Sequence, residues 1–309
     1  MRDRIVILGV FVADCAFRAD RLPVMGETVL GRAFALGPGG KGSNQAVAAA
    51  MAGGGGPVPA PPGGPPLAGH AAAARAGGRV QFLSRPGADP FADIARETWA
   101  RAGVTPEITE DPDSYTGAAF VFVEHGTGNN AIVISPGAGG RISAADMEAR
   151  AELIASAAVF ITQLEQPMEA ALRAMQIARA GGARTILNPA PAAPLPLGML
   201  ALADIVTPNE TEAEALTGLP VADLDGAARA AAALVAQGAG AALITLGARG
   251  ALWHGGGQTV HVPPFAAGPV VDTTGAGDAF NGGFAVAVVL GAGPVRAARL
   301  PPAPAPLSV

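Results

Sequence analysis

The sequence contains very little cysteine, lysine and aromatic residue. Cys15 is the only cysteine among 309 residues, so no disulfide can form within the chain. Lys41 is the only lysine, and the other basic residues are all arginines. Aromatics make up 5% of the chain, so Ala, Val, Leu and Ile must fill most of the core, which is feasible because half of the residues are apolar. The length allows one large α/β domain or two smaller ones.

Basic clusters, metal-ligand spacings and long apolar runs are also missing. The net charge is −5, and no basic run offers the positive surface that nucleic-acid phosphates require. The four histidines lie far apart and lack metal-ligand spacing. The apolar run Ile5–Val12 is shorter than a membrane span of about 18 to 20 residues, and Asp14 follows it where a signal peptide needs a small neutral residue. We therefore expect a cytoplasmic protein without nucleic-acid or membrane partners.

Short β-rich apolar runs alternate with Ala-rich helical stretches along the chain. We expect strands at Arg4–Val10, Arg79–Ser84, Ala158–Thr162, Arg184–Asn188, Asp204–Thr207 and Ala241–Leu246. We expect helices at Ser43–Ala52, Pro90–Ala102, Ala144–Ser156, Pro167–Ala180, Glu210–Thr217, Asp223–Gln237 and Gly275–Leu290. This alternation predicts βαβ units around a mostly parallel sheet, with ligands at the carboxyl ends of its strands.

Some segments fall outside that alternation. Thr28–Leu36, Ala118–Glu124 and Asn130–Ser135 read as extended pieces, which could form a small antiparallel flap or extend an edge of the main sheet. In Gly53–Gly69, 13 of 17 residues are Gly or Pro, a composition typical of a flexible loop. The four prolines of Pro301–Pro306 exclude a regular helix there.

A Gly-rich segment, Gly37–Asn44, opens the first predicted helix. Glycines before a helix let backbone N–H groups approach a ligand closely. The segment is similar to a Walker A loop, but Gly42 follows Lys41 where Ser or Thr is required. A compact ammonium in a chain that otherwise uses arginine indicates a specific role for Lys41. The alternative is a turn with a solvated lysine.

A second small-residue segment, Val271–Gly283, runs directly into an apolar helix. Free N–H groups of Gly275, Ala276 and Gly277 would face an anion at the helix N-terminus. Asp278 lies in the first helical turn, where a carboxylate could act as the general base beside that anion pocket. Alternatively, Asp278 only complements the helix dipole, which is worth about 0.3–1 kcal/mol.

Other polar residues follow predicted strands. Asn209 and Glu212 could form a capping box, or could hold Mg²⁺ through water near nucleotide phosphates. The segment 243–250 is a strand followed by a turn bounded by glycines, which is generic by itself. Asp14 and Glu165 follow two strands, where a polar ligand would bind. Either carboxylate could equally be a surface charge.

Five motifs together resemble a known family. GPGGKGSNQAVAAA (37–50) and DTTGAGDAFNGGF (272–284) are similar to the two signatures of the PfkB-type carbohydrate kinases. TPNETEAEALTG (207–218), NPAPA (188–192) and QLEQP (163–167) resemble the ribokinase branch. The resemblance implies a single kinase domain over 1–309. It would be a three-layer α/β/α sandwich with a small β-sheet lid, built from about 15–38 and 117–136. It also implies ATP, Mg²⁺, a monovalent cation such as K⁺, and a homodimer formed through the lid.

The resemblance also assigns roles by position. It implies that Asp278 is the catalytic base and that Gly275, Ala276 and Gly277 form the anion hole. The residues implied to bind the sugar are Asp14, Gly39, Gly40, Lys41, Asn44 and Glu165. Those implied to bind nucleotide are Asn209, Thr245, Gly247 and Gly250. Those implied to hold metal ions are Asn209 and Glu212 for Mg²⁺, and Asp272 and Thr274 for the monovalent cation.

Three departures from the family pattern bear on function. Val12 stands where ribokinases usually have an Asn that contacts ribose. The insert 51–71 splits a normally continuous stretch, and the proline-rich end 301–309 stands where the family has a helix before further residues that enclose adenine and the cation. The leading hypothesis is phosphorylation of D-ribose by ATP to ribose 5-phosphate. The alternatives are a kinase for another sugar or a nucleoside, and a sugar-binding remnant with impaired catalysis.

Overall fold

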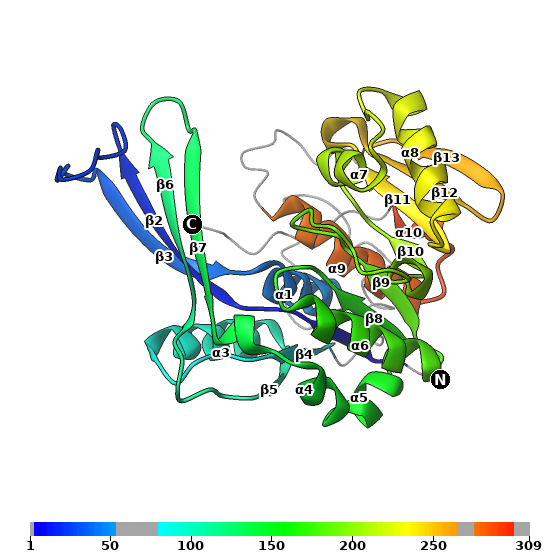
Figure 1. Cartoon of the computed structure of the whole chain (residues 1–309), viewed down its shortest axis with the longest axis horizontal. Helices are drawn as coiled ribbons and strands as arrows, with labels where there is room; N and C mark the ends of the chain where they lie inside the picture. The colour runs from blue at the N-terminus through cyan, green and yellow to red at the C-terminus, as the bar shows by residue number, and fades with distance from the viewer. Residues whose placement is uncertain (1–2, 54–79, 265–274, 300–309) are drawn as a thin grey trace, which may run out of the picture.

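The computed structural model describes residues 3–53, 80–264 and 275–299, and these residues form two sheets with helices around the larger one (Figure 1). The larger sheet has nine strands in the order β13-β12-β11-β10-β9-β8-β1-β4-β5. Its strands are β1 Ile5–Leu8, β4 Val80–Ser84, β5 Thr105–Ile108, β8 Val159–Thr162, β9 Arg184–Leu187, β10 Ile205–Val206, β11 Ala241–Thr245, β12 Ala251–Gly255 and β13 Gln258–Val262. From β5 to β11 all neighbours pair in parallel, and β12 and β13 add an antiparallel edge.

Helices cover both faces of this sheet. They are α1 Lys41–Ala52, α3 Pro90–Ala102, α4 Ala144–Glu148, α5 Ala151–Ala155, α6 Met168–Ala180, α7 Glu210–Thr217, α8 Leu224–Ala236, α9 Ala276–Val289 and α10 Pro294–Ala297. Among the described helices, none combines the length and hydropathy that a membrane-spanning segment needs. This arrangement confirms the predicted α/β sandwich with a mostly parallel sheet.

The central strand β1 shows how one short run supplies two cores. Successive side chains of a strand point to opposite faces. Ile5 and Ile7 belong to the core under α1, α3 and α9, whereas Val6 and Leu8 belong to the core under α6 and α8. All four side chains are at most 1% exposed. A strand buried on both faces needs a continuous apolar run, and such a run can be recognised in the sequence.

A small group of aromatic residues packs in the core under α1, α3 and α9. Trp99 of α3 makes edge contacts with Phe11 and Phe82, at ring-centroid distances of 5.8 and 5.3 Å. Its indole Nε1 donates a hydrogen bond of 2.9 Å to Oγ of Ser43 on α1. This buried contact therefore ties α3 to the helix that begins at the Gly-rich segment.

A second sheet of four strands stands apart from the main one (Figure 1). Its order is β3-β2-β6-β7, with β2 Val12–Ala19, β3 Ala33–Gly39, β6 Thr116–Glu124 and β7 Asn130–Gly137. The segments predicted as a flap or an edge extension thus form a separate sheet. It is not wholly antiparallel, because β2 and β6 pair in parallel.

Two local details differ from the sequence expectations. The helix expected over 144–156 is two short helices, and Arg150 between them has φ −118° and ψ 19°, outside the helical range. Its guanidinium donates to Oγ1 of Thr109 at 2.8 Å. Strand β2 continues almost directly from β1, and it begins at Val12, before the lid piece of about 15–38 that the resemblance implies. Residues 54–71 of the predicted insert 51–71 and the proline-rich end 301–309 lie outside the described residues.

Gly282 tests the packing between α1 and α9, which lie side by side (Figure 1). A Cβ at Gly282 would lie 2.7 Å from the carbonyl oxygen of Gln45 and 2.7 Å from the amide nitrogen of Ala49. Neither backbone atom can move aside without shifting α1. We therefore expect Gly282→Ala to lower the free energy of unfolding by about 1–3 kcal/mol, measured by urea denaturation. Gly293→Ala, where a Cβ meets nothing within 4 Å, is the control and should change it by less than about 0.5 kcal/mol. Equal stability of both variants would contradict the close packing.

Candidate active site

Polar side chains gather where β1, β8, β9 and β10 end and where α1 and α9 begin. The carboxyl ends of parallel strands share one edge of the sheet, which is where ligands bind in such folds. Strand β2 starts at the same edge and carries Asp14. The structure thus places residues from the two predicted glycine-rich segments and from the second sheet around one location.

Two glycines allow the chain to pass closely by Asp14 at the start of α1. A Cβ at Gly39 would lie 2.3 Å from Oδ2 of Asp14, so a side chain there would displace the carboxylate. Gly40 is the N-cap of α1 with φ 88°, and its Cβ would lie 2.5 Å from the carbonyl oxygen of Val10. Position 40 therefore requires glycine, whereas a side chain at Gly39 would require the Asp14 carboxylate to move. The carboxylate of Asp14 and the first turn of α1 consequently lie against one another.

Lys41 and Glu165 meet at the N-terminus of α1. The backbone N–H of Lys41 donates a hydrogen bond of 2.7 Å to Oε2 of Glu165, in the turn after β8. A carboxylate at this end also complements the helix dipole. The ammonium of Lys41 makes no hydrogen bond or ion pair within the part of the chain that the structure describes, so it remains available to a ligand.

Asp278 lies in the first turn of α9 and is 7% exposed. Nδ2 of Asn44 donates to its Oδ2 at 3.2 Å, and Nε2 of Gln45 donates to its Oδ1 at 3.0 Å. Burial raises the pKa of Asp278, while the Lys41 charge and the two amide donors oppose this rise. A carboxyl group with a raised pKa is a stronger proton acceptor when it is ionised, as a general base must be.

The site holds more than one carboxyl group with a raised pKa. Burial raises the pKa of Asp14 to about 6. Burial also raises the pKa of Glu165 to about 7; the Lys41 charge lowers it, and the charges of Asp278 and Asp14 raise it further. These groups therefore influence each other electrostatically, and Lys41 supplies the compensating positive charge. A neutral, hydroxyl-rich ligand fits such a set of acceptors better than an anion does.

Within the described residues, the first turn of α9 keeps backbone donors without partners. Gly275 is its N-cap with φ 74°, and no side chain of a described residue caps the helix. The N–H groups of the first turn have no intrahelical acceptors. Ala276 and Gly277 are exposed and donate no hydrogen bond to any described residue. A Cβ at Gly277 would meet nothing within 4 Å. In the described part of the chain, two of the three residues predicted to form the anion hole thus have N–H groups without acceptors next to Asp278.

The residues expected on the nucleotide side lie at the ends of β10 and β11. Asn209 and Glu212 form a reciprocal capping box, with hydrogen bonds of 2.8 and 2.9 Å. Burial raises the pKa of Glu212, and the charges of Lys41 and Asp278 reach it. Asn209 and Thr245 form a parallel β-bridge. The structure therefore brings these residues to the same edge as Asp278.

Backbone conformation and close packing explain why the turn after β11 contains two glycines. Gly247 has φ 52° and opens a short 3-10 turn, and Gly250 has φ 87°. A Cβ at Gly250 would lie 2.1 Å from the carbonyl oxygen of Val262 on β13. Gly250 thus packs against the sheet edge. The two remaining metal candidates, Asp272 and Thr274, lie outside the described residues.

Among the described residues, no three or more His, Cys, Asp or Glu side chains come together in a way that could hold a metal ion. A Mg²⁺ ion would therefore depend on phosphate oxygens and water as well as on Glu212, whose Oε1 is outside the capping box. This chemistry fits the usual binding of Mg²⁺ through one carboxylate and substrate phosphates.

Several buried amide side chains at the site were not assigned roles from the sequence. Four are the amides of Gln45, Gln163, Asn188 and Asn281, and the hydroxyl of Thr207 joins them. Each of these five side chains is at most 6% exposed. They lie in the quoted motifs, yet only one of them, Gln45, touches Asp278 directly. A polar side chain on the buried face of an otherwise apolar helix is the signal that could have found Gln45.

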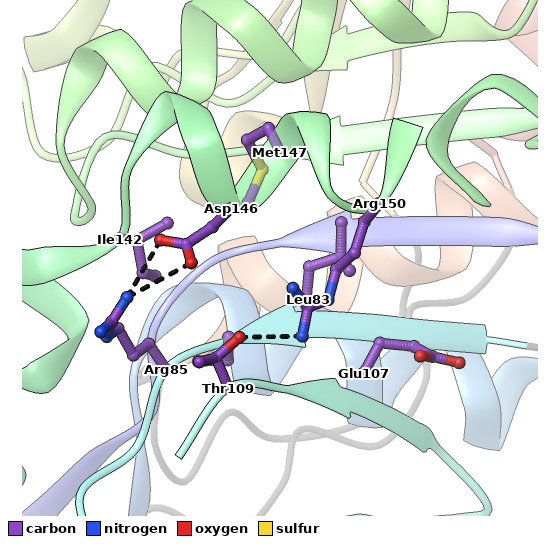
Figure 2. A pocket seen from close by; sticks show the side chains of 9 residues that line it. Leu83, Arg85, Glu107, Thr109, Ile142, Asp146, Met147 and Arg150 are labelled. Atoms are coloured by element: carbon purple, nitrogen blue, oxygen red, sulfur yellow. Dashed lines mark hydrogen bonds and ion pairs between the residues drawn. The ribbon is translucent and has the colours of Figure 1, made fainter. Parts of the chain in front are cut away.

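A small pocket elsewhere does not contribute to this site. Figure 2 shows it beside the ends of β4 and β5, where Arg85 is paired with Asp146 and Arg150 with Thr109. Its volume of about 10 Å³ has room for one water molecule. The pocket is therefore too small for a sugar or a nucleotide.

Glu165 gives the site a measurable effect on stability. Its pKa is about 7 in the folded chain against an ordinary 4.5. The unfolded chain therefore loses this proton first, and stability falls as pH rises from 4.5 to 7. Glu165→Gln keeps the acceptor for the Lys41 N–H and removes the ionisation. In urea denaturation without ligands, we expect this variant to lose less stability between pH 5 and 8, by roughly 3 kcal/mol at most. Glu152→Gln, at an exposed position of α5, controls for the lost charge; an unchanged pH slope for Glu165→Gln would contradict the assignment.

Comparison with known proteins agrees with the geometry. The pfkB family carbohydrate kinase profile matches residues 2–309. A ribokinase of Haemophilus influenzae is 36% identical over 290 residues, covering 94% of this chain and 86% of the relative. A deoxyribokinase of Salmonella typhi is 35% identical, covering 91% and 84%. The solved structure of Arabidopsis thaliana ribokinase with ribose and ATP has a TM-score of 0.83 at 28% identity, covering 97% and 90%. The chain therefore belongs to the pfkB family of carbohydrate kinases and is a ribokinase-like phosphotransferase that acts on a sugar hydroxyl group.

Proposed function

We propose that this protein transfers the γ-phosphoryl group of ATP to the primary hydroxyl of D-ribose, giving ribose 5-phosphate and ADP. The observation that carries the proposal is the buried Asp278 carboxylate beside the open N-terminus of α9. A base and a group of anion-stabilising donors are the two things that phosphoryl transfer needs. Ribokinases among the relatives support ribose as the substrate.

The reaction follows from these positions. Asp278 accepts the proton of the attacking hydroxyl, whose oxygen forms the new O–P bond as the bond from phosphorus to the ADP oxygen breaks. The N–H groups of Gly275, Ala276 and Gly277 stabilise the negative charge that develops on the phosphoryl oxygens. Mg²⁺, when bound, neutralises phosphate charge and orients the phosphates. Asn209 and Glu212 are suited to hold it through water. Asp272 and Thr274 are our candidates for a monovalent-cation site.

The sugar site is formed by both sheets. Asp14 and Glu165 accept hydrogen bonds from sugar hydroxyls, while Lys41 and Asn44 donate to them. Gly39 and Gly40 let the sugar approach the backbone at the start of α1. Further contacts with the nucleotide come from Thr245, Gly247 and Gly250 in the turn after β11.

The second sheet is suited to act as a lid and as a dimer interface. Phe17, Phe34 and Phe120 form a contacting aromatic group on its surface and are 40–58% exposed. A contiguous exposed apolar surface of this kind favours association. Asp14, at the base of β2, would bring the sheet into contact with bound sugar. We therefore propose a homodimer joined through this sheet.

Val12 favours a second candidate, a kinase for a pentose that lacks one hydroxyl. Val12 is two residues before Asp14 on β2, so both side chains lie on the same face of the strand. Val12 is 3% exposed and cannot pair with a hydroxyl group. Deoxyribokinases are about as similar to this chain as ribokinases are. This candidate differs from the first only in the sugar.

The first test concerns Asp278. Asp278→Asn keeps the size of the side chain and removes the proton acceptor. We expect kcat with ribose to fall by about 10²- to 10⁴-fold while the KM for ribose changes little, measured by coupled ADP release. Asp225→Asn, on the exposed first turn of α8, is the control. A normal kcat for Asp278→Asn would remove this residue from the mechanism. Wild-type protein that binds ribose but transfers phosphate to no sugar would instead support a binding protein.

The second test separates the two sugars. Val12→Asn introduces an amide that can pair with a sugar hydroxyl. We expect the ratio of kcat/KM for ribose to that for 2-deoxyribose to rise about 10-fold over wild type. Because the ratio is measured on one preparation, a fraction of unfolded protein does not affect it. Val12→Ala, which adds no polar group, should leave the ratio nearly unchanged. A wild-type ratio well below one would establish the second candidate in place of ribose.

A further inference from the structure

Gln45 is a fully buried amide in contact with the proposed base. It lies on α1, directly after Asn44, and is 0% exposed. Its Nε2 donates to Oδ1 of Asp278 and to Oδ1 of Asn188, both at 3.0 Å. Its Oε1 accepts a hydrogen bond of 2.6 Å from Nε2 of Gln163. All three bonds link Gln45 to segments more than 100 residues away in the sequence.

Gln163 prevents a flip of the Gln45 amide, which would exchange the positions of its Oε1 and Nε2. Because Gln163 donates to Oε1 of Gln45, Nε2 must face Asp278 and Asn188. Gln163 itself is 0% exposed and lies against two glycines. A Cβ at Gly9 would lie 2.6 Å from Oε1 of Gln163, and one at Gly42 would lie 3.0 Å from it. The close approach of β1 to α1 therefore holds Gln163 in place, and Gln163 orients Gln45.

The same hydrogen bonds continue to the start of α9. Nδ2 of Asn188 donates to the carbonyl oxygen of Thr207 at 2.9 Å, and Oγ1 of Thr207 donates to Oδ1 of Asn281 at 2.7 Å. Nδ2 of Asn281 then donates to the carbonyl oxygen of Gly277 at 2.9 Å. Gly277 directly precedes Asp278, so the chain of bonds ends next to the residue that Gln45 contacts. Oε1 of Gln163 has no hydrogen-bond partner among the described residues, whereas both polar atoms of the Gln45 amide are paired. Paired side chains in a buried network hold one another in place.

We propose that Gln45 is a positioning residue that fixes Oδ1 of Asp278, so that Oδ2, on the side of Asn44, takes the proton from the sugar hydroxyl. This inference rests on the proposed function. Asn44, itself a proposed sugar contact, donates to Oδ2, so Oδ2 is the oxygen of Asp278 on the side of the proposed sugar site. A donor that pairs with the charged form of a carboxyl group also favours that form over the protonated one.

The alternative is that Gln45 only fills the interface between α1 and α9. That role would change stability but would leave the pH dependence of kcat intact. The charged groups that act on Asp278 are Lys41 at the start of α1, Glu165 after β8 and Glu212 on α7. None of them changes when Gln45 is replaced by a neutral side chain. A shift in the pH profile would thus report the lost donor.

Gln45→Met keeps the length of the side chain and removes the donor. We expect kcat to fall about 10-fold, with the KM for ribose within about threefold of wild type. We also expect the acidic limb of the profile of kcat against pH to move to higher pH, because the ionised base loses a stabilising partner. Gln166→Met is the matched control. Gln166 is 4% exposed, and its amide contacts Thr162 and the carbonyl of Gln163 rather than Asp278.

Gln163→Met provides a second variant in case Gln45→Met folds poorly. It leaves the donor of Gln45 in place but frees its amide, so we expect a smaller shift of the acidic limb in the same direction. A wild-type kcat and pH profile for both variants, while Asp278→Asn is inactive, would overturn the positioning role and leave the proposed function standing. Full activity of Asp278→Asn would overturn the base assignment itself. In the Asp278→Asn background, Gln45→Met should cause no further loss of kcat, and a further 10-fold loss would contradict the proposal.

Discussion

The close packing of α1 on α9 is the constraint on which the rest of the site depends. Gly282 lets the two helix backbones approach until only a hydrogen atom fits between them. At this separation Asn44 and Gln45 reach both oxygens of Asp278. The start of α1 and the start of α9 also come to the same edge of the sheet. One glycine in the second motif thus aligns the proposed sugar contacts with the proposed base.

Charge balance imposes a second constraint. Burial raises the pKa of Asp14, Glu165 and Asp278, so each carboxylate is held in a less favourable environment than water. Lys41 offsets part of this effect, and hydrogen bonds from α1 offset another part. The ionised form of these carboxyl groups is therefore disfavoured relative to water. Hydroxyl groups of a sugar that donate to these oxygens would stabilise the ionised form.

Much of the fold was predictable from the sequence, and part of the site was not. The buried parallel strands could be predicted because each is a continuous apolar run. The start of α9 could be predicted because small residues precede an apolar helix. The role of Gln45 was hidden because its partners lie in three distant segments, while glutamine is also an ordinary helix former. The break at Arg150 was hidden for a similar reason, since Thr109 lies on another part of the chain. Local pattern gives the elements, whereas side-chain networks depend on the assembled tertiary structure.

The single lysine of the chain has a practical consequence for chemical modification. Apart from the α-amino group, Lys41 carries the only primary amine in the sequence, and the structure places it at the start of α1 beside Glu165. An amine-selective reagent therefore reports on one side chain at the proposed sugar site, without the background of surface lysines that most proteins present. Occupancy of the site can thus be followed as protection of one amine from acylation, and an electrophilic sugar analogue would have one lysine side chain as its target.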